Sequence, residues 1–146
     1  MTRIDFYQVD SAEAPLLFTC RLIEKAYRRS HQIYIHTTSK DQAEELDDLL
    51  WSYRADRFIP HSLQANTETA PIKIGHDHEP EEHQDFLINL SGEVPDFFSR
   101  FKRVAEIVPL GDENRDSARA NYKFYKDRGY KLNYHDMKQT AKQKNG

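Results

Sequence analysis

The order of apolar and polar residues near the start of the chain constrains the fold most strongly. Residues 4–9 are rich in strand-forming side chains, and the next apolar residues repeat at helical spacing: Leu16, Cys20, Ile23 and Tyr27. A second strand is expected over residues 32–36, and a second helix after Ser39, which forms a capping box with Gln42. This strand–helix–strand–helix order predicts βαβ units and therefore a mainly parallel sheet flanked by helices.

Later segments extend this α/β pattern. We expect short strands over residues 71–74 and 85–90, the second apolar enough to lie at the centre of a parallel sheet. Pro95 begins a short helix that turns three phenylalanines inward, namely Phe97, Phe98 and Phe101. Residues 51–63 show no clean period, and the chain becomes polar after Leu132. We predict a single α/β domain over residues 1–137 and a frayed polar tail over residues 138–146.

Residues 104–129 combine a buried strand, a Pro-Leu-Gly turn and a helix that runs from Asp112 to just before Gly129. Helical spacing gathers four cations and a tyrosine on one side of that helix: Arg115, Arg119, Tyr122, Lys123 and Lys126. The adjoining side is expected to pack on the sheet, and it carries Ser117, Ala118, Asn121, Phe124 and Tyr125. We refer to Arg115, Arg119, Lys123 and Lys126 as the basic face.

The basic face stands out against an acidic protein. The whole chain has a formal charge of −3, yet residues 100–146 hold twelve Lys and Arg against six Asp and Glu. The first 99 residues hold nine against eighteen. The positive charge is therefore a local feature that overall composition does not explain.

Composition and motifs narrow the classes of function. Cys20 is the only cysteine, so an intramolecular disulfide is impossible, and no apolar run is long enough for a membrane span. The first residues show no secretory signal, and we expect a cytoplasmic protein without membrane contact.

The motifs of nucleotide and catalytic sites are missing as well. The sequence has no GxGxxG, GxxxxGK[ST], GxSxG or HExxH motif, so we expect no cofactor and no catalytic site. His76, His78 and His83 offer a competing metal-site interpretation, which we disfavour because they fall in a loop with no regular element to hold the ligands in a fixed geometry.

Two surfaces have alternative interpretations. The basic face suits either single-stranded nucleic acid or a short acidic peptide whose terminal aromatic side chain enters a pocket near Val108; an ordinary solvated face is the third alternative. Trp51, Phe58 and Pro60 either fold over the core or remain exposed to anchor a protein partner.

The chain resembles the chi subunit family of the bacterial DNA polymerase III holoenzyme over essentially its whole length, and four stretches carry the resemblance. They are FYQVD (residues 6–10), LLWSYRADRFIPHSL (49–63), FLINL (86–90) and VPLGDENRDSARANYKFYKDRGYKLNY (108–134). Two spacings are specific in combination, W-x(6)-F-[IV]-P-H and A-R-x-x-Y-K-x-Y-[KR].

The resemblance implies a non-catalytic accessory subunit with a nucleotide-binding-like fold that lacks the phosphate loop. It implies a clamp-loader partner, psi, on Trp51, Phe58, Ile59 and Pro60. It also implies that the acidic C-terminal tail of single-stranded DNA-binding protein binds at Val108, Arg115, Arg119, Tyr122 and Lys123. A helicase is a further candidate partner at the aromatic patch, and contact with DNA is expected to be mainly indirect. One departure is Arg115, where the best-known member has lysine.

Overall fold

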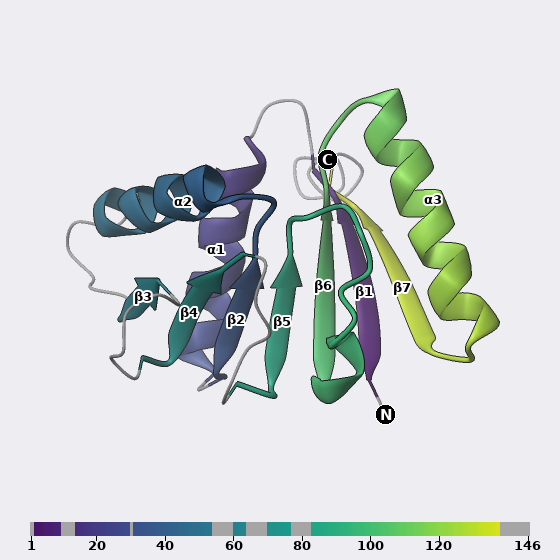
Figure 1. Ribbon diagram of the computed structural model, residues 1–146, viewed down its shortest axis with the longest axis horizontal. Helices are drawn as coiled ribbons and strands as arrows, with labels where there is room; N and C mark the ends of the chain where they lie inside the picture. Colours follow the sequence, from purple (N-terminus) through teal and green to yellow (C-terminus); the bar gives the residue numbers. More distant parts are fainter. Residues whose placement is uncertain are drawn as a thin grey trace, which may run out of the picture.

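The computed structural model describes residues 2–9, 14–29, 31–53, 60–63, 70–76 and 83–137. Its elements follow in chain order: β1 (Arg3–Gln8), α1 (Pro15–Arg28), β2 (Ile33–His36), α2 (Lys40–Tyr53), β3 (His61–Leu63), β4 (Ile72–Gly75), β5 (Phe86–Asn89), the 3₁₀ helix η1 (Phe98–Arg100), β6 (Arg103–Val108), α3 (Asp112–Asp127) and β7 (Lys131–Asp136). Seven strands form one sheet in the order β3-β4-β2-β5-β6-β1-β7 (Figure 1). Every pairing is parallel, which confirms the predicted α/β class.

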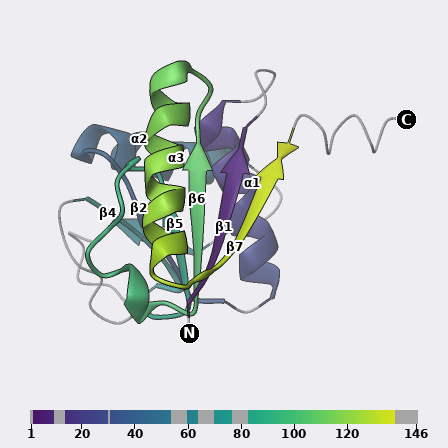
Figure 2. The same cartoon turned by 90° about the vertical axis from the view of Figure 1, so that its right-hand side faces the viewer.

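The sheet separates two apolar layers. Helices α1 and α2 bury Cys20, Ile23 and Leu46 against one face, where they meet alternate strand residues such as Ile35. On the other face, α3 and η1 bury Tyr125 and the three predicted phenylalanines. Figure 2 shows the sheet between α3 on one side and α1 on the other. Burying both faces explains why β5, the central strand, is buried at all four positions.

Neighbouring strands β1 and β6 send the chain to opposite faces of the sheet. β1 leads to α1, whereas β6 leads to α3 (Figure 1). In open parallel sheets, ligands commonly bind outside the carboxyl ends of two such strands. Val108 is the last residue of β6, so it lies at this point.

A buried carboxylate joins the three strands on this side of the sheet. Asp5 on β1 accepts a hydrogen bond from Arg103 Nε on β6 at 3.1 Å, and its other oxygen lies 3.1 Å from His135 Nε2 on β7. Burial alone would raise the pKa of Asp5, but these two partners hold the pKa below its ordinary value. The side-chain network therefore fixes the position of the edge strand β7.

Two strands differ from the sequence-based predictions. β3 lies in the segment for which we predicted no regular structure, and its three residues are too few to display an alternating pattern. β7 lies where we predicted only a polar chain, because the strand ends the sheet and its side chains stay partly exposed. Both misses concern the two edges of the sheet.

Gly129 ends α3 in a left-handed conformation, with φ of +82°. The amide of the next residue, Tyr130, donates to the Tyr125 carbonyl at 3.2 Å, as in a Schellman cap. We expect Gly129→Ala to lower the free energy of unfolding by about 1 kcal/mol, measured by urea denaturation. A Cβ would meet no atom within 4 Å, so the cost comes from the backbone alone. Gly129→Asn should be tolerated better, and an alanine variant as stable as the wild type would contradict this account.

Candidate functional site

The basic face is exposed along α3. Arg115, Arg119, Lys123 and Lys126 all point to solvent, as their spacing predicts. Arg115 is engaged by Asp112, one turn earlier, at 2.9 Å. Within the described residues, no acidic side chain pairs with Arg119 or Lys123. The same holds for Lys126, so Arg115 is the one member of the basic face that pairs with an acidic side chain within the described residues.

Tyr122, which the helical spacing places among these cations, is half-buried. Its ring packs against Phe6 of β1, with 5.5 Å between ring centroids. Phe6 also stacks on Tyr134 of β7, with centroids 6.1 Å apart and planes 14° from parallel. We call Tyr122, Phe6 and Tyr134 the aromatic row. The row borders the basic face where α3 lies over β1 and β7.

Tyr134 lies beside the candidate site, and the sequence analysis did not single it out. It is 49% exposed, and its hydroxyl donates to Gln8 Oε1 at 3.1 Å. Gln8 Nε2 in turn donates to the carbonyl of Val108 at 3.1 Å. Desolvation raises the pKa of Tyr134 and Asp136 adds to this, while Arg115 and Arg119 oppose it. The available signal was the alternation of Leu132 and Tyr134, which both face α3.

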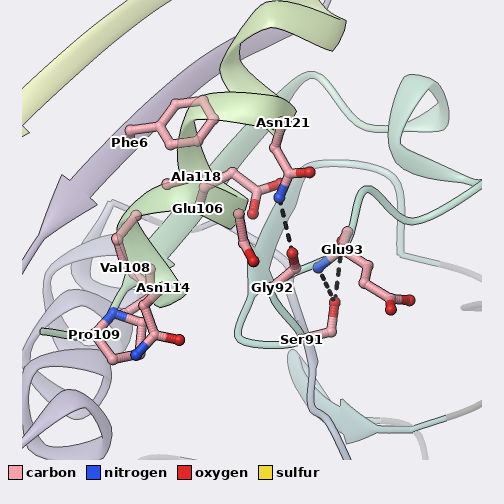
Figure 3. A pocket seen from close by; sticks show the side chains of 12 residues that line it. Phe6, Ser91, Gly92, Glu93, Glu106, Val108, Pro109, Asn114, Ala118 and Asn121 are labelled. Atoms are coloured by element: carbon pink, nitrogen blue, oxygen red, sulfur yellow. Dashed lines mark hydrogen bonds between the residues drawn. The ribbon is translucent and has the colours of Figure 1, made fainter. Parts of the chain in front are cut away.

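The opposite flank of α3 borders a cavity of about 200 Å³. Asn114, Ser117 and Asn121 line it from the helix, and residues 91–93 line it from a turn. Figure 3 shows Asn121 beside Gly92 of this turn. Asn121 Nδ2 closes one side by donating to the Gly92 carbonyl at 2.9 Å. Of the predicted peptide-binding residues, only Val108 lines this cavity. The structure thus contains a pocket near Val108 but does not surround it with the cations of the basic face.

Ser117 also departs from the prediction. We expected it to pack on the sheet, but it is exposed because the cavity separates it from the turn beyond. Ala118 and Tyr125 are buried, and Asn121 and Phe124 are half-buried. The predicted inner side of α3 is therefore correct for four of five residues.

An acidic group lies at the base of the cavity. Glu106 of β6 is 3% exposed, and it accepts hydrogen bonds from Tyr125 at 2.6 Å and from Asn89 at 2.8 Å. Burial raises the pKa of Glu106 to about 7, although both hydrogen bonds act in the opposite direction. The carboxyl group is therefore close to half-protonated at neutral pH.

Trp51 lies in the last turn of α2, not in an irregular segment, and it is 56% exposed. Its ring centroid is 4.9 Å from that of His61, whose Nε2 is 3.3 Å from Asp47 Oδ1. Burial raises the pKa of Asp47, and His61 and a hydrogen bond from Trp51 lower it. The indole is therefore exposed on one side, while His61 and Asp47 contact it on the protein side. Pro60 is half-buried, and Phe58 and Ile59 lie outside the described residues.

The histidines of the acidic loop do not form a cluster where the structure describes them. His83 is buried, and its Nε2 lies 2.8 Å from the Ala70 carbonyl. His78 lies outside the described residues. Among the residues that can be placed, no three potential ligands gather around a metal position. Nor does that part of the chain contain a helix both long enough and apolar enough to cross a bilayer.

Comparison with known proteins decides the family. Residues 1–133 match the family model described as DNA polymerase III chi subunit, HolC. The chain belongs to this family. A chi subunit from Pseudomonas aeruginosa is 45% identical over 139 residues, which is 94% of this chain and 98% of that relative. The Escherichia coli chi subunit is 30% identical over 128 residues, or 86% of this chain and 87% of the relative. Membership of the chi family indicates an accessory subunit of a polymerase complex in DNA replication.

Proposed function

We propose that the chain is a non-catalytic accessory subunit that links the clamp loader to single-stranded DNA-binding protein. One observation carries this proposal: the basic face and the exposed Trp51 lie on helices that cover opposite faces of the sheet. Two partners could therefore bind at once without competing for space. By binding both the psi subunit of the clamp loader and the acidic tail of single-stranded DNA-binding protein, the chain would connect the polymerase machinery to coated template.

The tail-binding surface is proposed to include Val108, Arg115, Arg119, Tyr122 and Lys123. Arg119 would hold the terminal carboxylate through its two-pronged guanidinium group, and Lys123 would meet acidic side chains of the tail. Exposed charge pairs contribute only about 0.2 to 1 kcal/mol each, so apolar contacts must supply much of the affinity. The aromatic row offers such contacts beside the cations.

A direct binding experiment tests this role. Immobilised single-stranded DNA-binding protein, intact or without its acidic tail, is probed with the chain, and a bare oligonucleotide serves as the third surface. We expect binding to the intact protein alone, weakened by added salt. Binding to the bare oligonucleotide, with equal binding to both forms of the protein, would favour direct nucleic-acid recognition instead.

The psi-binding surface is proposed to include Trp51, Phe58, Ile59 and Pro60, and a helicase partner would compete for it. Trp51→Ala should weaken psi binding at least about thirtyfold, because exposed tryptophans at interfaces are commonly hot spots worth about 2 kcal/mol or more. Titrations of psi and of the acidic peptide into the same variant check this expectation. The peptide affinity should not change, and simultaneous loss of both would disprove two independent surfaces. Ser52→Ala, beside it on α2, is the matched control.

A further inference from the structure

Tyr134 is held rigidly beside the basic face. Its ring stacks on Phe6, and its hydroxyl donates a hydrogen bond to Gln8 Oε1. The backbone beneath is fixed by pairing with β1 and by the contact between His135 and Asp5. A ring fixed in this way loses little conformational entropy when another ring packs against its exposed part. Tyr134 is therefore pre-organised for contact with an aromatic or apolar group.

Positively charged side chains lie near Tyr134, where they could bind the carboxylate of a C-terminal aromatic residue. Arg115 and Arg119 lie on α3, whose Tyr122 packs on the same Phe6 ring that stacks on Tyr134. A C-terminal aromatic residue carries its side chain and a free carboxylate on the same carbon. A ring on Tyr134 and a carboxylate on Arg119 would satisfy both groups together.

The cavity on the other flank of α3 fits such a residue less well. Phe6 of the aromatic row also lines this cavity, but the charged residues of the lining are Glu93 and Glu106, and no basic-face side chain is among them. A peptide that placed its terminal ring there would bring its carboxylate towards the exposed Glu93, which repels it, and no cation of the basic face lines the cavity to offset this repulsion. The charges on the two flanks thus favour the aromatic row over the pocket near Val108.

We infer that Tyr134 is a specificity-determining residue, whose ring stacks on the C-terminal aromatic side chain of an acidic peptide bound at the basic face. This inference rests on the proposed function and adds a contact that the family resemblance did not assign. It places the terminal ring between α3 and β7 rather than in the cavity near Val108.

A double-mutant cycle tests the contact. Wild-type chain and Tyr134→Ala are each titrated with an acidic peptide ending in Ile-Pro-Phe and with one ending in Ile-Pro-Ala. We expect Tyr134→Ala to bind the first peptide about tenfold more weakly, because an aromatic pair and its buried area are lost. The two proteins should bind the second peptide about equally. A purely structural role of Tyr134 would weaken both peptides alike and would overturn the inference.

Two further variants separate the alternatives. Tyr134→Phe keeps the ring and loses only the bond to Gln8, so its affinity should stay within about twofold of the wild type. Ser117→Leu fills the mouth of the cavity from an exposed position, and it should leave binding unchanged. Strong loss with Ser117→Leu and none with Tyr134→Ala would place the ring in the cavity and overturn the inference while the proposed function stands. Failure of the wild type to bind the peptide would instead overturn the proposed function itself.

Discussion

Arg119→Ala is expected to weaken binding of the acidic peptide by about tenfold to a hundredfold, measured by titration calorimetry. A charge-assisted hydrogen bond contributes about 1.5 to 3 kcal/mol, and a forked arginine contact with a carboxylate lies within that range. Arg119 is exposed and has no acidic partner within the described residues, so it can approach the ligand without breaking an internal contact. Arg115 must first leave Asp112, and we expect a smaller loss on its replacement.

Matched variants show whether the geometry of Arg119 matters or only its charge. Lys126→Ala removes an equal charge further along the same helix and should change the affinity by less than about threefold. Arg119→Lys keeps the charge but loses the fork, so it should fall between the wild type and Arg119→Ala. Equal, small effects of Arg119→Ala and Lys126→Ala would mean that the basic face acts only as diffuse charge and that no carboxylate clamp exists.

The wild-type protein should lose stability as the pH rises because Glu106 ionises, and Glu106→Gln should abolish this loss. The carboxyl has a pKa of about 7 in the folded protein, against an ordinary value of 4.5. Between these values the folded state keeps the proton that the unfolded chain releases, so the free energy of unfolding falls as pH increases. This loss approaches about 3 kcal/mol above pH 7. Glutamine keeps one acceptor and one donor for Tyr125 and Asn89 but cannot ionise.

Urea unfolding at pH 5 and pH 8 measures this effect. At each pH, the unfolding free energy of the wild type is subtracted from that of Glu106→Gln. We expect this difference to be about 2 kcal/mol more positive at pH 8 than at pH 5. Other titrating groups are common to both proteins and cancel in this comparison. Glu93→Gln, from the exposed part of the same cavity, is the control and should show no such change. A difference independent of pH would mean that Glu106 is ionised in the folded protein throughout this range.

The central layers of the fold were predictable because their residues face uniform surroundings. A strand such as β5 is buried on both sides and is apolar throughout, and α3 has a clear inner side around Ala118 and Tyr125. The edge strands were not predictable in this way. β7 is partly exposed along its length, and its pairing depends on distant contacts between His135 and Asp5. Local periodicity contains no information about such long-range partners.

In the candidate site, too, features set by local spacing were predictable, and features set by contacts between distant residues were not. Helical spacing alone was enough to find the exposed cations of α3, since Arg115 and Arg119 lie on one continuous element. It could not show that Tyr122 packs on Phe6. Nor could it show that Tyr134, which is distant from Phe6 in the sequence, lies beside it and completes the aromatic row. Likewise, the exposure of Trp51 depends on how α2 ends over His61, which the sequence left open.

Titration of the chain with an acidic peptide ending in Ile-Pro-Phe, beside the same peptide without its final residue, tests the central proposal most directly. We predict saturable binding of one peptide per chain for the complete sequence, and binding at least about tenfold weaker for the shortened one. The first peptide alone presents both a terminal aromatic ring and an adjoining carboxylate to Arg119 and the aromatic row. No binding of either peptide, or equal binding of both, would contradict recognition of the acidic tail at this surface.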